Sequence, residues 1–245
     1  YSHKNLANHH GGVVLVGGEP TLRRDLRVVL QMAHRLGLAA GLATNGRMLV
    51  YPQSAGVARY PPEHFPFAGT PPRAWDTSRF NPAFWRHLEQ RVGQLRDLGI
   101  EADLILHHPY DDPRAWGLDD LPREVDERYA RYLVARLAAY SNVWWSLANE
   151  WDFVRTKTEA DWERLGQLLQ RIDPYNHLRS IHNGKRLFDQ TRPWITHVSL
   201  QNGMAAAEAS RAVLFRDVWR KPVVFDEVKY EGNHDRRWAQ LSGRE

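Results

Sequence analysis

The stretch that decides the fold spans residues 143–150 and reads Val143-Trp144-Trp145-Ser146-Leu147-Ala148-Asn149-Glu150. A mainly apolar run that ends in an amide and a carboxylate is typical of a buried strand with polar side chains at its carboxyl end. Amphipathic patterns flank this run, over residues 125–140 and from Thr158, with Asp161 as its capping partner, to Ile172. The stretch therefore predicts one strand–helix unit of a parallel sheet.

The same alternation continues towards both ends of the chain. We expect a helix from about residue 22 to residue 37, and another that begins with Asn81 and Pro82, an N-cap followed by proline, and ends at Gly99. Residues 53–78 are rich in proline, glycine and aromatic residues without periodicity, which predicts a long loop. Strands are expected at 13–16, within 38–52, and at 102–107, 143–148, 179–181, 197–200 and 222–225.

About seven strand units in 245 residues favour an α/β fold of the TIM-type (β/α)8 barrel over an open sheet, because a complete barrel typically needs roughly 250 residues. The eighth strand is missing from this series. We therefore expect an incomplete barrel that lacks its last unit.

The composition excludes several chemistries. The chain has no cysteine, so it cannot form disulfides, thiolate zinc sites, cysteine-ligated iron–sulfur clusters or a cysteine nucleophile. Its net charge of +4 is spread along the chain, which does not indicate a nucleic-acid partner. The 10 Trp, 9 Tyr and 8 Phe, many beside carboxylates or prolines, favour a ligand with apolar faces and polar rims.

No targeting segment is evident. No run approaches the roughly 18–20 apolar residues that cross a bilayer, and residues 1–10 lack the apolar core of a signal peptide. We expect a soluble chain without a membrane partner, with the cytoplasm favoured as its location. The missing initiator Met and the polar last residues suggest that both ends are cut from something longer.

Polar side chains follow the expected strands, and in a parallel barrel these carboxyl ends surround the active site. Two glutamates on separate strand ends, Glu150 and Glu227, form the pair needed for glycoside cleavage: one donates a proton to the leaving oxygen, and the other attacks the anomeric carbon or activates water. The residues expected to bind substrate are Asn149, His108, Tyr110, Asp111, Trp151, His182, Asn183, Gln201, Lys229 and Tyr230.

Each assignment has a plainer alternative. Glu150 taken alone could be a surface carboxylate. Asp226 competes with Glu227, but adjacent strand residues point to opposite faces, so one of them enters the mouth, and we choose Glu227. His107, His108 and His182 lack the His-Glu-x-x-His spacing of a helical metal site, so we read them as hydrogen-bonding groups and expect no metal and no cofactor.

The aromatic residues near the expected site divide into two groups. Trp144 and Trp145 are consecutive on a strand, so one of them is expected to pack into the core or the helix layer. Sugar platforms are expected from Trp75, Trp116 and Trp151.

Four segments carry a resemblance to a family. They are residues 75–82, residues 108–111, residues 146–150 and the run Asp226-Glu227-Val228-Lys229-Tyr230-Glu231-Gly232-Asn233. With these segments, residues 47–245 resemble a cellulase-like (clan A type) glycoside hydrolase barrel of a little-characterised bacterial branch. The resemblance implies a retaining mechanism with Glu150 as acid/base and Glu227 as nucleophile, and it implies that Asn149 binds the hydroxyl next to the reacting carbon.

The first residues resemble a different family. Gly17-Gly18-Glu19-Pro20-Thr21, the expected helix and Ala43-Thr44-Asn45-Gly46 are similar to a fragment of a radical S-adenosylmethionine enzyme. The three cysteines that hold the cluster in that family are absent, so its chemistry has no electron donor. We therefore infer a chimeric chain in which residues 1–46 form a βαβ segment that packs as part of one structural domain with residues 47–245.

These inferences lead to a ranked hypothesis. A retaining glycosidase with a carbohydrate substrate comes first. A catalytically silent carbohydrate-binding or structural barrel comes second, and a degenerate radical S-adenosylmethionine protein comes last. The sequence leaves open the sugar, the linkage, endo or exo action and the oligomeric state.

Overall fold

The computed structural model describes residues 12–15, 39–44, 65–70, 74–109, 118–201 and 210–227. A parallel sheet contains β1 (Gly12–Leu15), β2 (Ala39–Thr44), β5 (Glu101–His107), β6 (Val143–Ala148) and β7 (Arg179–Ser180), in the order β1-β2-β5-β6-β7. Strands β8 (Val198–Gln201) and β9 (Val223–Glu227) form a second parallel pair. The predicted parallel α/β architecture is confirmed.

A closed barrel is not seen. Within the described ranges the strands form the five-stranded sheet, the β8–β9 pair and one antiparallel hairpin, with no ladder joining them into a ring. The predicted loss of a last unit therefore remains a prediction. Strand β2 pairs with β5 from Gly41↔Glu101 to Thr44↔Leu104, so the first segment of the chain shares the main sheet. The predicted helix at 22–37 lies outside the described residues.

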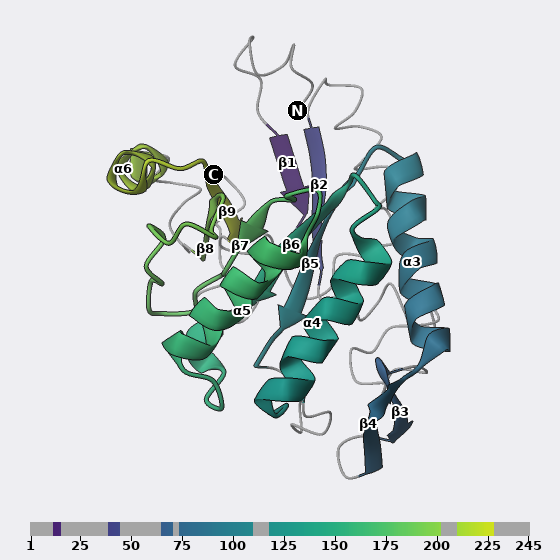
Figure 1. Cartoon of the computed structure of the whole chain (residues 1–245). Helices are drawn as coiled ribbons and strands as arrows, with labels where there is room; N and C mark the ends of the chain where they lie inside the picture. Colours follow the sequence, from purple (N-terminus) through teal and green to yellow (C-terminus); the bar gives the residue numbers. More distant parts are fainter. Residues whose placement is uncertain are drawn as a thin grey trace, which may run out of the picture.

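Three helices cover one face of the main sheet (Figure 1). They are α3 (Pro82–Asp97), α4 (Arg123–Leu137) and α5 (Glu159–Ile172), while the short α6 (Ser210–Trp219) lies beside β9 at the periphery. The predicted caps are confirmed. The Asn81 side chain accepts from the N–H of Ala83 at 3.1 Å, and Thr158 and Asp161 form a capping box in which each side chain accepts from the other's backbone N–H.

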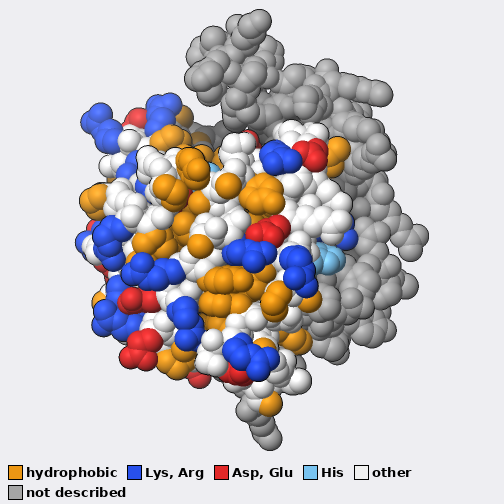
Figure 2. Space-filling model, turned by 45° about the vertical axis from the view of Figure 1, so that its right-hand side comes forward, with side chains coloured by type: hydrophobic (Ala, Val, Ile, Leu, Met, Phe, Trp, Pro, Cys, Tyr) orange, Lys and Arg blue, Asp and Glu red, His pale blue; other side chains and the backbone are white. Residues whose placement is uncertain are grey.

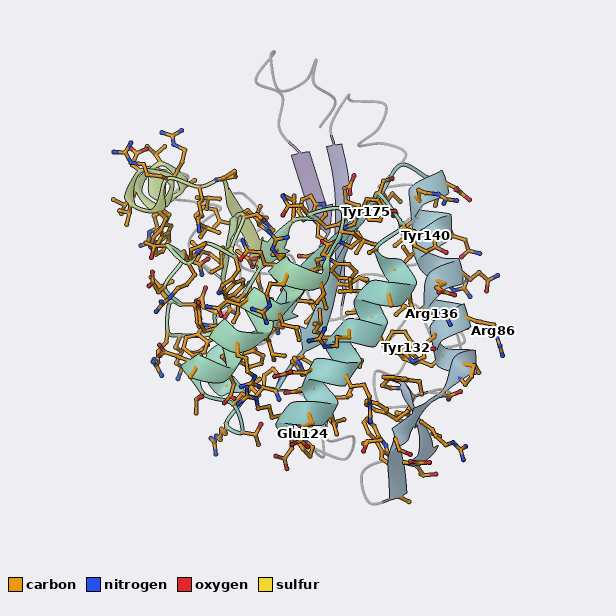
Figure 3. All side chains as sticks on the ribbon, viewed as in Figure 1. Arg86, Glu124, Tyr132, Arg136, Tyr140 and Tyr175 are labelled. Carbon is orange, nitrogen blue, oxygen red and sulfur yellow. The ribbon has the colours of Figure 1, made fainter. Side chains whose placement is uncertain are left out.

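The helix layer and the strands both contribute to the core. On α5 the residues Trp162, Leu165, Leu168 and Leu169 are buried, as the amphipathic pattern of this segment predicts. Helices α3 and α4 are joined by Arg136, which donates from Nε and Nη2 to the two carboxylate oxygens of Glu89 at 2.6 Å each. Figure 3 shows Arg136 and Tyr132 pointing from α4 towards α3.

The expected long loop is wrong in part. Strands β3 (Phe67–Thr70) and β4 (Ala74–Phe80) pair antiparallel as a hairpin within the predicted loop region and just beyond it. Phe67 is fully buried and stacks on Phe80 with 5.1 Å between ring centroids, which fixes the hairpin against the core. Gly69 has φ 86°, and a Cβ there would lie 2.0 Å from the carbonyl oxygen of Ala74, so this position requires glycine.

The charged side chains on the surface are dispersed, as the sequence predicts. Figure 2 shows Lys and Arg side chains scattered over the described part of one face, among acidic and apolar ones. None of the described helices is both long and apolar enough to span a membrane.

Candidate active site

The carboxyl end of β6 places Glu150 in a buried and conformationally restricted position. Glu150 lies two residues after Ala148, the last residue of β6, and is 5% exposed. Its φ of 45° and ψ of 57° place it in the left-handed region. A residue with a side chain rarely adopts this conformation, and such residues cluster at functional sites. The backbone turn directs the chain from β6 into the 3-10 helix η2 (Trp151–Phe153).

Backbone hydrogen bonds from both neighbouring strands hold this turn. The N–H of Asn149 donates to the carbonyl oxygen of His107 at 2.9 Å. On the other side, the N–H of His182 donates to Ala148 and the N–H of Trp151 donates back to His182, each at 3.0 Å. Glu150 is therefore fixed between the ends of β5 and β7.

The end of β9 carries both carboxylates that compete for the nucleophile role. The β8–β9 register shifts between Leu200 and Gln201, which pair with Phe225 and Glu227, so Asp226 is the extra residue of a β-bulge. The expectation that adjacent residues point to opposite faces is therefore wrong here, and both carboxylates approach His182. Its Nδ1 lies 2.8 Å from Oδ1 of Asp226, and its Nε2 lies 3.4 Å from Oε2 of Glu227.

The two carboxylates have different surroundings. Asp226 is 9% exposed and accepts from the hydroxyl of Ser199 as well as from His182. Burial raises the pKa of Asp226, but the charge of His182 and these hydrogen bonds outweigh it, so the pKa lies below its usual value. Glu227 is less buried, with a side chain 15% exposed, and lies at the other ring nitrogen.

The charge of His182 follows from the same contacts. Burial alone lowers the pKa of this imidazole, whereas the carboxylates of Asp226 and Glu227 raise it, and the net effect is a pKa of about 10. Asp103 on β5 is a further buried carboxyl nearby, with one oxygen, Oδ1, that has no hydrogen-bond partner. Burial and the charge of Asp226 raise the pKa of Asp103 to about 7.

The loop after β7 is anchored from the loop after β6. Asp152 accepts from the backbone N–H groups of Gly184, Lys185 and Arg186 at 2.6, 2.8 and 2.9 Å. Burial raises the pKa of Asp152, but the three N–H donors have the larger opposite effect, so the pKa lies below its usual value. This carboxylate is therefore ionised at neutral pH. It holds the chain next to Asn183, the residue expected to bind substrate.

Asn183 and Gln201 come together, as the sequence predicts for residues at strand ends. The Asn183 side-chain oxygen accepts from the N–H of Gln201 at 3.2 Å, and Asn183 itself is buried. Their proposed contact with substrate remains a prediction.

The two histidines at the carboxyl end of β5 differ in position: His107 is the last residue of the strand, and His108 follows it. His107 is 1% exposed and faces the helix layer, where its Nδ1 lies 3.2 Å from the carbonyl oxygen of Leu118 and its Nε2 lies 3.7 Å from Asp126. Burial lowers the pKa of His107 well below its usual value, so the ring is neutral. Asp126 is also paired with the buried ammonium of Lys157. His108 is 9% exposed and stays a candidate for substrate contact.

The tryptophans separate as follows. Trp145 is fully buried and donates to Asp173 at 3.0 Å, whereas Trp144 packs edge-on to His197, so the expected division of this pair is confirmed. Trp151 is 3% exposed, packs against Phe188 and lies under the Arg186 guanidinium. A sugar platform needs an open ring face, which the buried ring of Trp151 does not offer in this structure. Its expected contact with substrate remains a prediction.

Several expected site residues lie outside the described part of the chain, namely Tyr110, Asp111, Trp116, Lys229 and Tyr230. Trp75 is partly buried in the aromatic cluster of the β3–β4 hairpin, with 5.5 Å between its ring centroid and that of Phe67. Among the residues with described positions, no three His, Cys, Asp or Glu side chains gather in a group that could hold a metal ion.

Sequence reasoning missed three contributors to the site. Ser199 and Asp103 lie inside expected strands and carry no local motif, so their roles depend on the strand pairing. Asp152 had a usable signal, because a carboxylate in the loop directly after a strand is well placed to accept from a neighbouring loop's N–H groups.

Comparisons with known proteins identify a family and several solved relatives. The family model described as "Apiosidase-like, catalytic domain" matches residues 48–244. A putative glycoside hydrolase from Bacteroides vulgatus ATCC 8482 is 39% identical, with a TM-score of 0.78 over 95% of this chain and 47% of that one. No curated protein matches the chain.

More distant solved structures share the fold. A glycoside hydrolase family 5 protein from Bacteroides vulgatus ATCC 8482 is 17% identical, with a TM-score of 0.55 over 90% of this chain and 49% of that one. An exo-beta-1,4-mannosidase from Opitutaceae bacterium strain TAV5 is 14% identical, with a TM-score of 0.54 over 89% of this chain and 45% of that one. The chain thus spans about half the length of each. The similarity of residues 11–46 to a radical S-adenosylmethionine enzyme, and the division of the chain at residue 46, remain predictions, because the family model begins at residue 48.

Proposed function

The chain belongs to the apiosidase-like family of catalytic domains, and from this premise we propose that it is a retaining glycoside hydrolase with Glu150 as acid/base and Glu227 as nucleophile. One observation supports the proposal. Glu150 lies two residues after β6 and Glu227 is the last residue of β9, and His182 links them. Its backbone bonds to both neighbours of the Asn149–Glu150 turn, and its Nε2 lies 3.4 Å from Oε2 of Glu227.

The proposed reaction runs in two steps. In the first, Glu150 gives its proton to the glycosidic oxygen while a carboxylate oxygen of Glu227 bonds to the anomeric carbon, and the alcohol leaves. In the second, Glu150, now ionised, takes a proton from water as the water oxygen attacks the anomeric carbon and the bond to Glu227 breaks. The sugar is released with its original anomeric configuration, and both glutamates return to their starting states.

The surroundings of the two residues suit these roles. Glu150 is 5% exposed, and burial of a carboxyl group favours the protonated form that an acid needs. Glu227 lies beside the positively charged His182, which favours the ionised form that a nucleophile needs. Different environments for two carboxyl groups are the general way in which one site provides both an acid and a nucleophile.

The proposed substrate is a glycoside, and we rank apiosides first because the matching family is described by that activity. Asn149, Asn183, Gln201 and His108 are the described polar groups proposed to meet its hydroxyls. Tyr110, Asp111, Lys229 and Tyr230 remain proposed as further contacts.

A silent carbohydrate-binding chain is the second candidate. It is favoured by the β8–β9 pair, which carries Glu227 and which no ladder joins to the five-stranded sheet among the described residues. Both candidates predict that the chain binds saccharides, but only the glycoside hydrolase is expected to cleave them.

The test is hydrolysis of a panel of aryl glycosides that includes an apioside, a mannoside, a glucoside and a glucuronide. The wild-type chain should release the aryl alcohol from at least one, and Glu227→Gln should lower kcat by about 10²–10⁴-fold or more. Asp97→Asn, at an exposed position on α3, serves as the matched control and should leave kcat unchanged. Saccharide binding measured by calorimetry without turnover of any glycoside would favour the silent candidate.

A further inference from the structure

We infer that His182 is a positioning residue for the proposed nucleophile: a buried imidazolium between Asp226 and Glu227 that keeps the Glu227 carboxylate ionised and oriented. The inference rests on the proposed function of Glu227. It assigns to His182 a role different from the substrate contact expected from the sequence.

The first support is the geometry of the two ring nitrogens. Nδ1 lies 2.8 Å from Asp226 Oδ1, and Nε2 lies 3.4 Å from Glu227 Oε2, with no closer hydrogen-bond partner for Nε2 among the described residues. A neutral imidazole has a proton on one nitrogen and a lone pair on the other. A lone pair facing a carboxylate is repulsive, so the arrangement fits a ring that is protonated at both nitrogens.

The second support is the state of Asp226. Its Oδ2 accepts from the Ser199 hydroxyl, while its Oδ1 faces the ring of His182. Both oxygens therefore act as acceptors, as they do in an ionised carboxylate. Ser199 and Asp226 hold the ring in one orientation and leave Nε2 directed at Glu227.

The third support is burial. The side chains of His182, Asp226 and Glu227 are 4%, 10% and 15% exposed. Water screens their charges poorly, so two adjacent carboxylates without a cation would repel each other and one would take up a proton. A protonated Glu227 could not attack the anomeric carbon. The imidazolium reduces the charge of the three groups from two negative charges to one.

Other titratable groups face this set from the neighbouring strands. From β5, Asp103 is a buried carboxyl whose pKa burial raises to about 7. His197, just before β8, has its pKa lowered by burial to about 4 and is neutral at pH 7. From the end of β6, Glu150 is linked to His182 through the backbone of Ala148 and Trp151. Among these three neighbours, none supplies a positive charge at pH 7 that could replace His182.

The first experiment determines the protonation of His182 without any assay of activity. The chain is labelled with 15N-histidine, and the ring signals of His182 are assigned as those lost in His182→Gln. Both ring nitrogens should be protonated from pH 6 to pH 8. In Asp226→Asn the ring should lose a proton within this range. A neutral His182 in the wild-type chain at pH 7 would overturn the inference.

The second experiment measures the pH profile of kcat/KM on a glycoside from the panel. In His182→Gln the midpoint of the acidic limb should move up by about 1 pH unit or more, because an opposite charge within about 4–6 Å lowers a carboxyl pKa by about 1–3 units. At pH 7 the loss should fall on kcat, with KM little changed. An unchanged acidic limb, or a raised KM with wild-type kcat, would assign His182 to substrate binding and contradict the inference.

The controls separate the possible failures. His87→Gln, on α3 and outside the site, should change neither the acidic limb nor kcat. If His182→Gln does not fold, Asp226→Asn provides both the spectroscopic and the kinetic measurement. If the wild-type chain cleaves no glycoside, the proposed function fails, while the ring signals still decide whether His182 is the imidazolium.

Discussion

The backbone N–H of Trp151 donates to the carbonyl oxygen of His182 at 3.0 Å, which ties the residue after Glu150 to the strand end that carries the imidazole. Together with the bond from His182 to Ala148, it holds Glu150 in the left-handed conformation, with φ 45°. In this conformation the Cβ of a non-glycine residue lies too close to the following carbonyl oxygen, which lowers the stability of the folded chain by roughly 1–2 kcal/mol. This cost predicts an unusual ranking of two variants.

Glu150→Gly should be as stable as Glu150→Ala, or more stable by up to about 1 kcal/mol, because glycine adopts positive φ without strain. Both should lose activity. Urea unfolding of the two variants measures the difference. The matched pair is Arg131→Gly and Arg131→Ala at an exposed position of α4, where alanine should be more stable by about 1 kcal/mol. If Glu150→Ala were clearly more stable than Glu150→Gly, the backbone at this position would not be strained.

Gly166→Ala should destabilise the chain by about 1–3 kcal/mol. A Cβ at Gly166 would lie 2.3 Å from the Trp194 ring, which is fully buried and donates to Glu163 at 2.9 Å. Gly93→Ala on α3 is the control, since its Cβ would meet Tyr140 at 3.6 Å, an ordinary contact. Alanine there should be neutral or stabilising. Equal thermal midpoints for the two variants would show that α5 can move away from Trp194.

Lys157→Met should cost about 3–5 kcal/mol of unfolding free energy, because it leaves the Asp126 carboxylate buried without its cation. The two side chains are 4% and 2% exposed. Adding Asp126→Asn to this variant should recover part of the loss, which a double-mutant cycle in urea measures. At the surface pair Arg96–Asp97, Arg96→Met should change stability little. A cost at Lys157 as small as that at Arg96 would mean that water reaches the buried pair.

The stability difference between the wild-type chain and His182→Gln should depend on pH. The pKa of His182 rises from 6.5 in the unfolded chain to about 10 in the folded chain. The stabilisation by its charge is therefore complete below pH 6.5 and is lost as pH rises through about 10. Unfolding free energies at pH 6, 8 and 10 should differ most between the two proteins at pH 6. A difference that stays constant or grows with pH would mean that the folded chain does not hold the proton.

Much of the fold could be predicted from periodicity and capping. The strand at 143–148 and the capping box of Thr158 and Asp161 depend on local sequence alone, and both are confirmed. The β3–β4 hairpin could not be predicted, because it depends on the pairing of Phe67 with Phe80 in a segment without regular alternation. Closure of the sheet depends on contacts between distant strands, which periodicity does not report.

The sequence could predict which residues belong to the candidate site, but not the contacts between them. The sequence places Glu150, Glu227 and His182 after expected strands, and the structure brings His182 close to both Glu227 and the turn at Glu150. The strict alternation that separated Asp226 from Glu227 fails at the β-bulge, whose position follows from pairing with β8. Burial of Trp151 likewise depends on Phe188, which is distant in sequence.

The most direct test of the central claim is to identify the residue that becomes covalently attached to the sugar. The wild-type chain is incubated with a 2-deoxy-2-fluoro derivative of the aryl glycoside that it cleaves, which slows the second step, and the labelled peptide is sequenced by mass spectrometry. The expected result is one equivalent of sugar on Glu227, lost on prolonged incubation as activity returns. A label on Asp226, or turnover of the parent glycoside with inversion and no labelled peptide, would contradict the assignment of Glu227 as the nucleophile.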